Sequence, residues 1–177
     1  MNALAPSMQP SHAHPRVRKP HSARARPDHG PAPPGGNGRP LRAVIVDDSP
    51  LVLKTLTSLL EEQTNIEIIG AATDGYGAVR RVLELRPDLV LMDLQLPGIN
   101  GLEATRQIKA RPHAPAVILV TADDTPGRRE AARAAGTDGF VDKQHLFTQL
   151  SPAIRKLFAG PNRLGRRYED EETIWDD

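Results

Sequence analysis

The sequence contains no cysteine, few aromatic residues and no long apolar run, and these absences limit what the protein can do. Without cysteine there is no disulfide, thiolate metal ligand or cysteine nucleophile, as is typical of proteins in a reducing cytosol. No stretch reaches the length of about 18 apolar residues that a membrane-spanning helix needs. The first residues also lack the apolar core of a secretory signal. We therefore expect a cytoplasmic protein with no membrane partner.

The first 40 residues differ in composition from the rest of the chain. They hold nine of the 17 prolines and six Lys or Arg side chains against one acidic residue, Asp28. Such a segment buries too little apolar surface to offset its ordering entropy, so residues 1–40 are predicted to be a disordered basic extension. It could be an inert linker, a contact with nucleic acid or membrane, or a partner-binding arm. Its four irregularly spaced histidines give little support for a metal site.

From Leu41 onward, short apolar runs alternate with segments of helical spacing, which predicts an α/β fold with a parallel sheet covered on both faces. Capping residues agree, with Ser49-Pro50, Asp74 and Asn100 at helix starts and Gly136 after a helix end. Pro152 predicts an irregular first turn or a kink in the last helix, 146–158. The expected strands are 44–46, 66–71, 88–92, 116–120 and 139–141.

Three aspartates stand at the ends of two of these strands. Asp47 and Asp48 follow the first apolar run, and Asp93 follows the third. The carboxyl ends of neighbouring parallel strands meet at one edge of a sheet, where ligands bind in such folds. Two carboxylates about 5 Å apart repel each other by about 3 kcal/mol at an effective dielectric constant of about 20. A cation, a shared proton or a function is expected to compensate for this repulsion.

Two further strands lead into Thr121 and Lys143. Taken singly, each residue has an ordinary explanation, because Asp and Thr after a strand often cap the next helix and a lone Lys is usually solvated. The aspartates, Thr121 and Lys143 all come at the carboxyl ends of their strands, four strands in all. This joint occurrence favours a shared site. Hard oxygen ligands in a partly open site suit Mg²⁺, which keeps waters and accepts a phosphoryl oxygen.

The pattern of these residues resembles the response-regulator receiver domain of two-component signalling. The resemblance implies a flavodoxin-like, doubly wound fold for residues 41–159, with a five-stranded parallel sheet of order 2-1-3-4-5 flanked by five helices. The run from Met92 to Glu103 is most similar to receivers that precede a helix-turn-helix output domain. The motifs are Val44–Pro50, Leu91–Glu103, Val120–Ala122 and Ala135–Lys143.

The resemblance implies a chemical role for each site residue. Asp93 would accept a phosphoryl group from a sensor histidine kinase or a histidine phosphotransfer protein. Asp47, Asp48, Asp93 and the backbone carbonyl of Gln95 would bind Mg²⁺. Lys143 would pair with one phosphoryl oxygen.

The resemblance also implies a switch. Thr121 would donate a hydrogen bond to the phosphoryl group, and the aromatic ring of Phe140 would turn in from solvent. The surface of the fourth helix, fifth strand and fifth helix would change for partner binding. The ordinary alternative for Phe140 is a half-buried core aromatic. Many receivers have proline where this sequence has Gln144, so the loop after Lys143 is predicted to lack a cis peptide.

Residues 160–177 are predicted to be a disordered acidic tail, or a short docking motif anchored by Ile174 and Trp175. These residues are too few for a DNA-binding domain. We therefore expect a stand-alone receiver with no DNA-binding domain, which acts on an unidentified output protein and could dimerise when phosphorylated.

Two other functions are compatible with parts of the sequence. A degenerate receiver would bind a partner independently of phosphorylation, but such domains usually lose at least one of the site residues kept here. A small hydrolase of similar topology commonly has a second catalytic Asp two residues after its nucleophile, where this chain has Gln95. We therefore expect no enzyme activity beyond self-phosphorylation and self-dephosphorylation.

Overall fold

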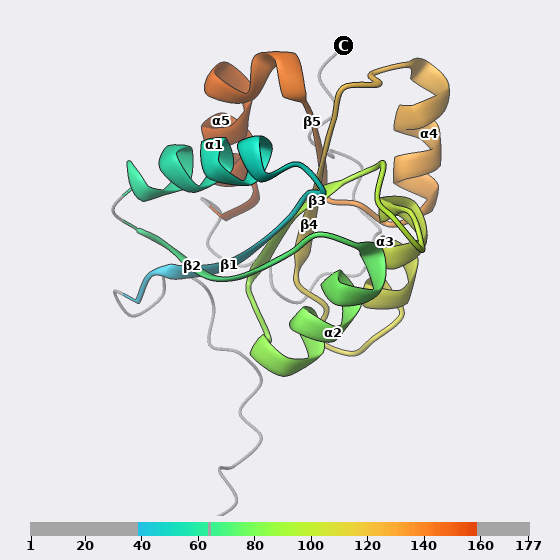
Figure 1. Cartoon of the computed structure of the whole chain (residues 1–177), viewed down its shortest axis with the longest axis horizontal. Coiled ribbons are helices and arrows are strands. Elements are labelled where there is room, and N and C mark those ends of the chain that lie inside the picture. Colours follow the sequence, from blue (N-terminus) through green and yellow to red (C-terminus); the bar gives the residue numbers. More distant parts are fainter. Residues whose placement is uncertain (1–38, 64, 159–177) are drawn as a thin grey trace, which may run out of the picture.

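A five-stranded parallel sheet in the order β2-β1-β3-β4-β5 runs through the centre of the protein (Figure 1). The computed structural model describes residues 39–63 and 65–158, so the expected extensions fall almost wholly outside the described residues. The strand order and direction confirm the predicted fold. The strands are β1 (Leu41–Val46), β2 (Ile66–Ala72), β3 (Leu89–Asp93), β4 (Ala116–Thr121) and β5 (Gly139–Asp142).

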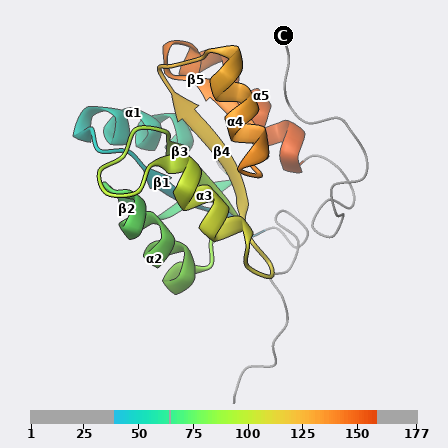
Figure 2. The same cartoon turned by 90° about the vertical axis from the view of Figure 1, so that its right-hand side faces the viewer.

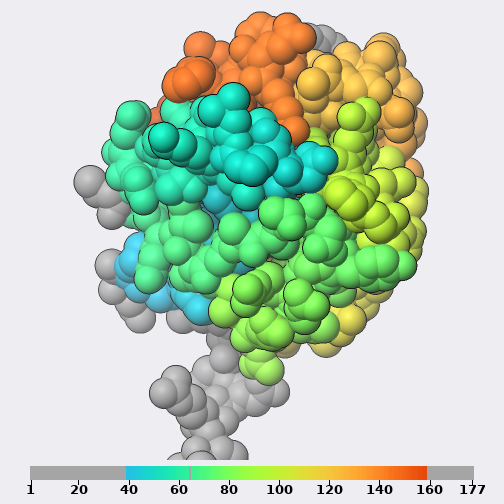
Figure 3. All heavy atoms as spheres, viewed as in Figure 1, coloured from blue at the N-terminus to red at the C-terminus, as the bar shows by residue number. Residues whose placement is uncertain are grey.

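Helices cover both faces of the sheet (Figures 1 and 2). On one face, α1 and α5 pack on alternate residues of the strands, and Figure 3 shows the two helices in contact. On the other face, α2, α3 and α4 pack on the remaining strand residues. All five residues of β3 are consequently buried, as expected for a central parallel strand. The helices are α1 (Pro50–Glu61), α2 (Gly75–Leu85), α3 (Gly101–Lys109), α4 (Pro126–Ala134) and α5 (Leu146–Phe158).

Two of the three predicted helix caps form. The side chain of Asp74 accepts a hydrogen bond of 2.7 Å from the Gly77 amide, and Asn100 caps α3. Ser49 stands at the N-cap of α1, but its side chain makes no capping hydrogen bond. Its amide instead donates to Asp47 Oδ1 at 2.9 Å, so the start of α1 orients a site residue.

Strand β3 begins one residue later than the sequence pattern indicates. Asp88, which the sequence pattern placed in the strand, lies just before it. Its buried carboxylate accepts hydrogen bonds from both terminal nitrogens of Arg39 and from the Arg42 amide. A buried charge needs such partners, since an isolated carboxylate is strongly disfavoured away from water. Asp88 therefore joins the start of β1 to the start of β3, at the opposite edge of the sheet from the three aspartates.

The last helix is continuous over the predicted residues, and the irregular turn lies before it and not at Pro152. A short 3₁₀ turn, η1 (Lys143–His145), precedes α5, and Pro152 lies inside the helix. No cis peptide bond occurs in the described part of the chain, which agrees with Gln144 in place of proline. Gly136 adopts a φ of 83° after α4, the left-handed conformation predicted for it. Within residues 39–63 and 65–158, no helix has the length and apolar character needed to cross a bilayer.

A close backbone approach fixes the loop between β3 and α3. The Gly101 amide donates a hydrogen bond of 2.9 Å to the Leu94 carbonyl. A Cβ atom at Gly101 would lie 2.0 Å from the carbonyl oxygen of Asp93. Only glycine fits there without moving the backbone of the expected phosphoacceptor.

Replacement of Gly101 by alanine is expected to lower the free energy of unfolding by about 1–3 kcal/mol, because the new methyl group overpacks the β3–α3 loop. Urea denaturation followed by circular dichroism at 222 nm measures this change. The matched control is Gly127→Ala in α4, where a Cβ would meet nothing within 4 Å. That variant should be slightly stabilised, by about 0.5 kcal/mol, through helix propensity. An equal effect of the two substitutions would contradict the close approach at Gly101.

Candidate functional site

Three aspartates lie together at the carboxyl edge of the sheet, as the sequence predicts. Asp47 and Asp48 follow β1, and Asp93 ends the neighbouring strand β3. One carboxylate oxygen from each of the three lies within 4.8 Å of the others. Asp47 and Asp93 are buried, with 1% and 4% of their surface exposed, whereas Asp48 is exposed to solvent. The cluster therefore has an inner, desolvated side and an outer side open to ligands.

Lys143 bridges the two buried aspartates. Its Nζ lies 2.6 Å from Asp47 Oδ2 and 2.9 Å from Asp93 Oδ1. Lys143 begins η1 immediately after β5, so the loop from the far edge of the sheet brings its side chain to the cluster. The sequence predicted that Lys143 pairs with a phosphoryl oxygen; in the structure its ammonium pairs with the carboxylate of the expected acceptor, Asp93.

Burial and neighbouring charges act in opposite directions on the pKa values of Asp93 and Lys143, and both pKa values end above their usual range. Burial raises the pKa of Asp93 and outweighs the lowering effect of Lys143, while the Asp47 charge raises the pKa further. Burial lowers the pKa of Lys143, but its contacts with Asp47 and Asp93 outweigh that effect and leave the pKa above its usual value. Lys143 is therefore held as a cation, and the ionised form of Asp93 favours further positive charge at the site.

A divalent cation fits this set of ligands. The three side chains offer hard oxygen atoms, the kind that Mg²⁺ and Ca²⁺ prefer. Asp47 Oδ2 is fully buried, and no donor among the described residues reaches it with hydrogen-bond geometry, although Lys143 Nζ is close. One ammonium serves two of the three carboxylates, so the cluster keeps a negative charge that a bound cation would neutralise. Gln95, whose carbonyl the sequence predicted as a fourth ligand, lies two residues after Asp93 at the outer side.

Thr121 and Phe140, the predicted switch residues, are both buried. The hydroxyl oxygen of Thr121 accepts a hydrogen bond of 3.1 Å from the Asp123 amide. Phe140 is only 6% exposed and belongs to the core beneath α4. The ring is thus observed in the inward position, not the solvent-facing one expected for the resting state. In this conformation Phe140 is a buried core side chain, which is close to the ordinary alternative that we gave for it.

Sequence reasoning missed two ion pairs that lie beside the switch. Arg128 Nε donates to Asp123 Oδ2 at 2.9 Å, and Arg129 donates through two nitrogens to both oxygens of Asp124. The guanidinium of Arg129 also lies 5.0 Å from the centre of the Phe140 ring. The repeated spacing of five residues between Asp and Arg was the available signal. These pairs join the loop after β4 to the first turn of α4.

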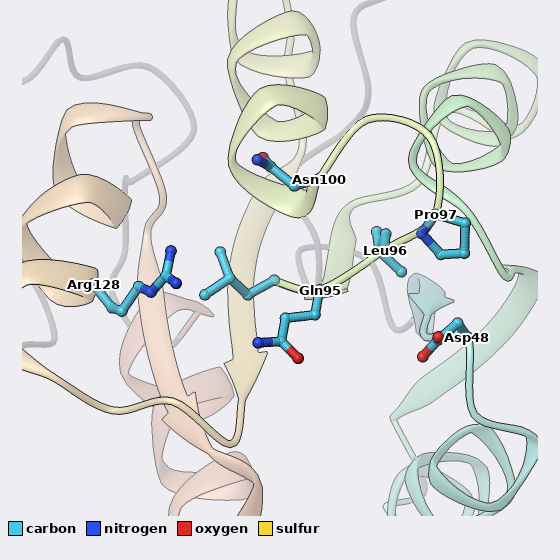
Figure 4. A pocket seen from close by; sticks show the side chains of 7 residues that line it. Asp48, Gln95, Leu96, Pro97, Asn100 and Arg128 are labelled. Atoms are coloured by element: carbon cyan, nitrogen blue, oxygen red, sulfur yellow. The ribbon is translucent and has the colours of Figure 1, made fainter.

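An open cleft of about 410 Å³ lies beside the cluster. Asp48 belongs to both the cluster and the cleft wall, so the cleft leads to the site. Figure 4 shows Gln95 between Asp48 and Arg128, which extends from the α4 side. The cleft is lined by Asp48, Leu94, Gln95, Leu96, Pro97, Asn100 and Arg128.

Known proteins match this chain over the folded region. The curated relatives include a protein-glutamate methylesterase/protein-glutamine glutaminase of Koribacter versatilis, 42% identical over 114 residues that cover 63% of this chain and 31% of that protein. The DNA-binding transcriptional activator EvgA of Escherichia coli K12 is 33% identical over 114 residues, covering 64% of this chain and 55% of EvgA. Each activity belongs to the named relative, so our expectation of no enzyme activity stays a prediction.

A solved structure shows the same fold. The two-component response regulator of the LuxR family from Aurantimonas sp. SI85-9A1 is 34% identical, with a TM-score of 0.65. The match covers 68% of this chain and 86% of that structure.

One predicted feature of the partners is wrong. We expected no DNA-binding domain, because few residues follow the last helix. EvgA is named as a DNA-binding activator, and this chain spans about half of its length. A receiver has its own core and site whatever output is attached to it, so the length of the segment after α5 does not decide the type of output.

The family profile of the response regulator receiver domain matches residues 43–155, which is most of the described chain. The match begins in β1 and ends in α5, and it includes every residue of the carboxyl-edge cluster. The strand order, the three clustered aspartates and the sequence relatives agree with this match. The chain belongs to the response regulator receiver domain family of two-component signalling.

Proposed function

We propose that the protein accepts a phosphoryl group on Asp93 in the presence of Mg²⁺ and thereby switches a protein surface. The observation that supports this most directly is the Lys143 ammonium, 2.9 Å from the Asp93 carboxylate in a cluster of three aspartates. A structural ion pair would need only one carboxylate. Two further acidic groups, the buried Asp47 and Asp48 in the wall of the cleft, favour binding of a cation together with an anionic substrate.

Each residue of the site has a separate role in phosphoryl transfer. Asp93 attacks the phosphorus of a phosphohistidine, a P–O bond forms, the P–N bond breaks and its electron pair leaves on the imidazole nitrogen. Lys143 moves from the carboxylate to a phosphoryl oxygen, and the Thr121 hydroxyl donates to another. Asp47, Asp48, Asp93 and the Gln95 carbonyl would hold Mg²⁺, which when bound neutralises charge on the transferring group.

The switch acts through the loop after β4. Thr121 gives up its present role as acceptor for the Asp123 amide when its hydroxyl turns to the phosphoryl group. Asp124 and Arg129 lie in the same segment, and Arg129 rests on the Phe140 ring. A shift of this loop therefore reaches the surface of α4, β5 and α5.

The phosphoryl donor is a sensor histidine kinase or a histidine phosphotransfer protein, as membership in the receiver family supports. Stand-alone action, expected from the sequence, stays a prediction, because nothing in the described residues identifies the output.

Replacement of Asp93 by asparagine is expected to abolish covalent labelling by a small phosphodonor, because the amide removes the nucleophilic oxygen. Intact-protein mass spectrometry detects the added phosphoryl group. The matched control is Glu103→Gln, an exposed carboxylate in the first turn of α3, which should label at the wild-type rate. Unchanged labelling of the Asp93 variant would remove this residue as the acceptor.

Mg²⁺ affinity is expected to fall by about tenfold or more in Asp48→Asn, because an accessible carboxylate next to the ion loses its charge. Isothermal titration calorimetry on the unphosphorylated protein measures the affinity without any transfer step. Asp123→Asn removes a charge near the same cleft but outside the cluster, and should weaken binding by about threefold at most. Equal losses in the two variants would show that general electrostatics, and no defined site, attracts the ion.

A further inference from the structure

Arg128 is the basic side chain in the wall of the open cleft that leads to the aspartate cluster. It projects from the first turn of α4 on the same side of Asp48 as Gln95 of the β3–α3 loop (Figure 4). Asp48 lies on the other side of Gln95 in this view. A ligand that reaches the cluster through this cleft therefore passes a guanidinium group.

Most of the hydrogen-bonding capacity of Arg128 is unused. Its Nε donates to Asp123, but its two terminal nitrogens donate to no atom of the described residues. The ion pair with Asp123 is exposed on both sides, with 46% and 34% of the side chains accessible, so water weakens it. Arg128 can therefore keep the Asp123 contact, or release it, while it binds an anion in the cleft.

The other arginines of α4 have different surroundings. Arg129 is bound through two nitrogens to Asp124 and covers the Phe140 ring, and Arg133 pairs loosely with Glu130. Neither of them lines the cleft. Position on the helix, and not the number of positive charges, thus distinguishes Arg128.

We propose that Arg128 binds the leaving group of small acyl phosphate donors and makes them better substrates than donors with a neutral leaving group. This inference rests on the proposed phosphorylation of Asp93. The phosphoryl oxygens face Lys143, Thr121 and the cation ligands, so these residues serve every donor alike. Arg128 lines the same cleft as Asp48, with Gln95 between them (Figure 4), so it is placed to contact the part of a donor that lies outside the phosphoryl group.

The charge that develops during transfer explains the selectivity. An Asp93 oxygen forms a bond to phosphorus, the bond between phosphorus and the acyl oxygen breaks, and its electron pair leaves on the carboxylate product. No proton is needed. With phosphoramidate, the P–N bond breaks and the already protonated nitrogen leaves as neutral ammonia. A guanidinium stabilises a departing carboxylate but has nothing to stabilise in departing ammonia.

The test compares two donors on the full chain. Rates of phosphorylation with acetyl phosphate and with phosphoramidate are followed by intact-protein mass spectrometry at fixed Mg²⁺ and ionic strength. In Arg128→Gln the second-order rate constant for acetyl phosphate should fall by about threefold to tenfold, while that for phosphoramidate stays within about twofold. Arg128→Lys should recover part of the loss, because the charge is kept.

Arg133→Gln is the matched control, since it removes an exposed, paired arginine from the same helix. Both donors should react with it as with the wild type. In Arg128→Gln the Asp123 charge loses its partner, so a second control combines this substitution with Asp123→Asn. The ratio of the acetyl phosphate rate constant to the phosphoramidate rate constant should stay as low in the double variant as in Arg128→Gln. Recovery of the wild-type ratio in the double variant would show that unmasked Asp123, and not lost Arg128, causes the effect.

Two other results would overturn the inference. If the rate constants for both donors fell equally in Arg128→Gln, Arg128 would act on the phosphoryl group, or through the overall electrostatic field of the protein, and not on the leaving group. Equal rates for Arg128→Gln and the wild type with acetyl phosphate would exclude any contact. Failure of the proposed function is distinguishable from both, because the wild-type protein would then react with neither donor.

Discussion

The ion pairs of Lys143 with Asp47 and Asp93 are the interactions on which the carboxyl edge of the sheet depends. Carboxylate oxygens within 4.8 Å of one another repel by about 3 kcal/mol per pair at an effective dielectric constant of about 20. One ammonium, 2.6 Å and 2.9 Å from two of them, offsets part of that repulsion. A net negative charge remains, and it adds to burial, the main cause of the raised pKa of Asp93. The contact that stabilises the edge thus leaves it suited to a cation.

The same edge is linked to the surface by the loop that follows β4. Thr121 ends the strand, Asp123 accepts from Arg128 at the cleft, and Asp124 holds Arg129 over the Phe140 ring. These contacts join the few residues between β4 and α4 to the first turn of α4, and backbone movement in that loop disturbs little of the core. A charge placed on Asp93 would therefore act on a short, polar segment, and the packed sheet would stay in place.

The sequence predicted the sheet, its order and the cluster because each depends on local patterns. Apolar runs that end in Asp47, Asp93 and Thr121 determine the strands, and parallel pairing brings their ends together. The start of β3 could not be placed, because Asp88 is fixed by a distant arginine, Arg39. Inward packing of Phe140 and the pairing of the α4 arginines depend on side-chain orientation in three dimensions, which spacing does not determine. The output cannot be predicted from a receiver, since the domain folds around its own core.

A titration with beryllofluoride, a mimic of an acyl-bound phosphoryl group, tests the central claim most directly. Amide ¹H–¹⁵N spectra of the labelled protein report on each residue of the site. If the carboxyl edge is a phosphoacceptor site, beryllofluoride with Mg²⁺ should shift the resonances of Asp93, Thr121 and Lys143 beyond any change that Mg²⁺ alone produces, and beryllofluoride without Mg²⁺ should not. Spectra that stay unchanged at saturating concentrations of both reagents would contradict the account.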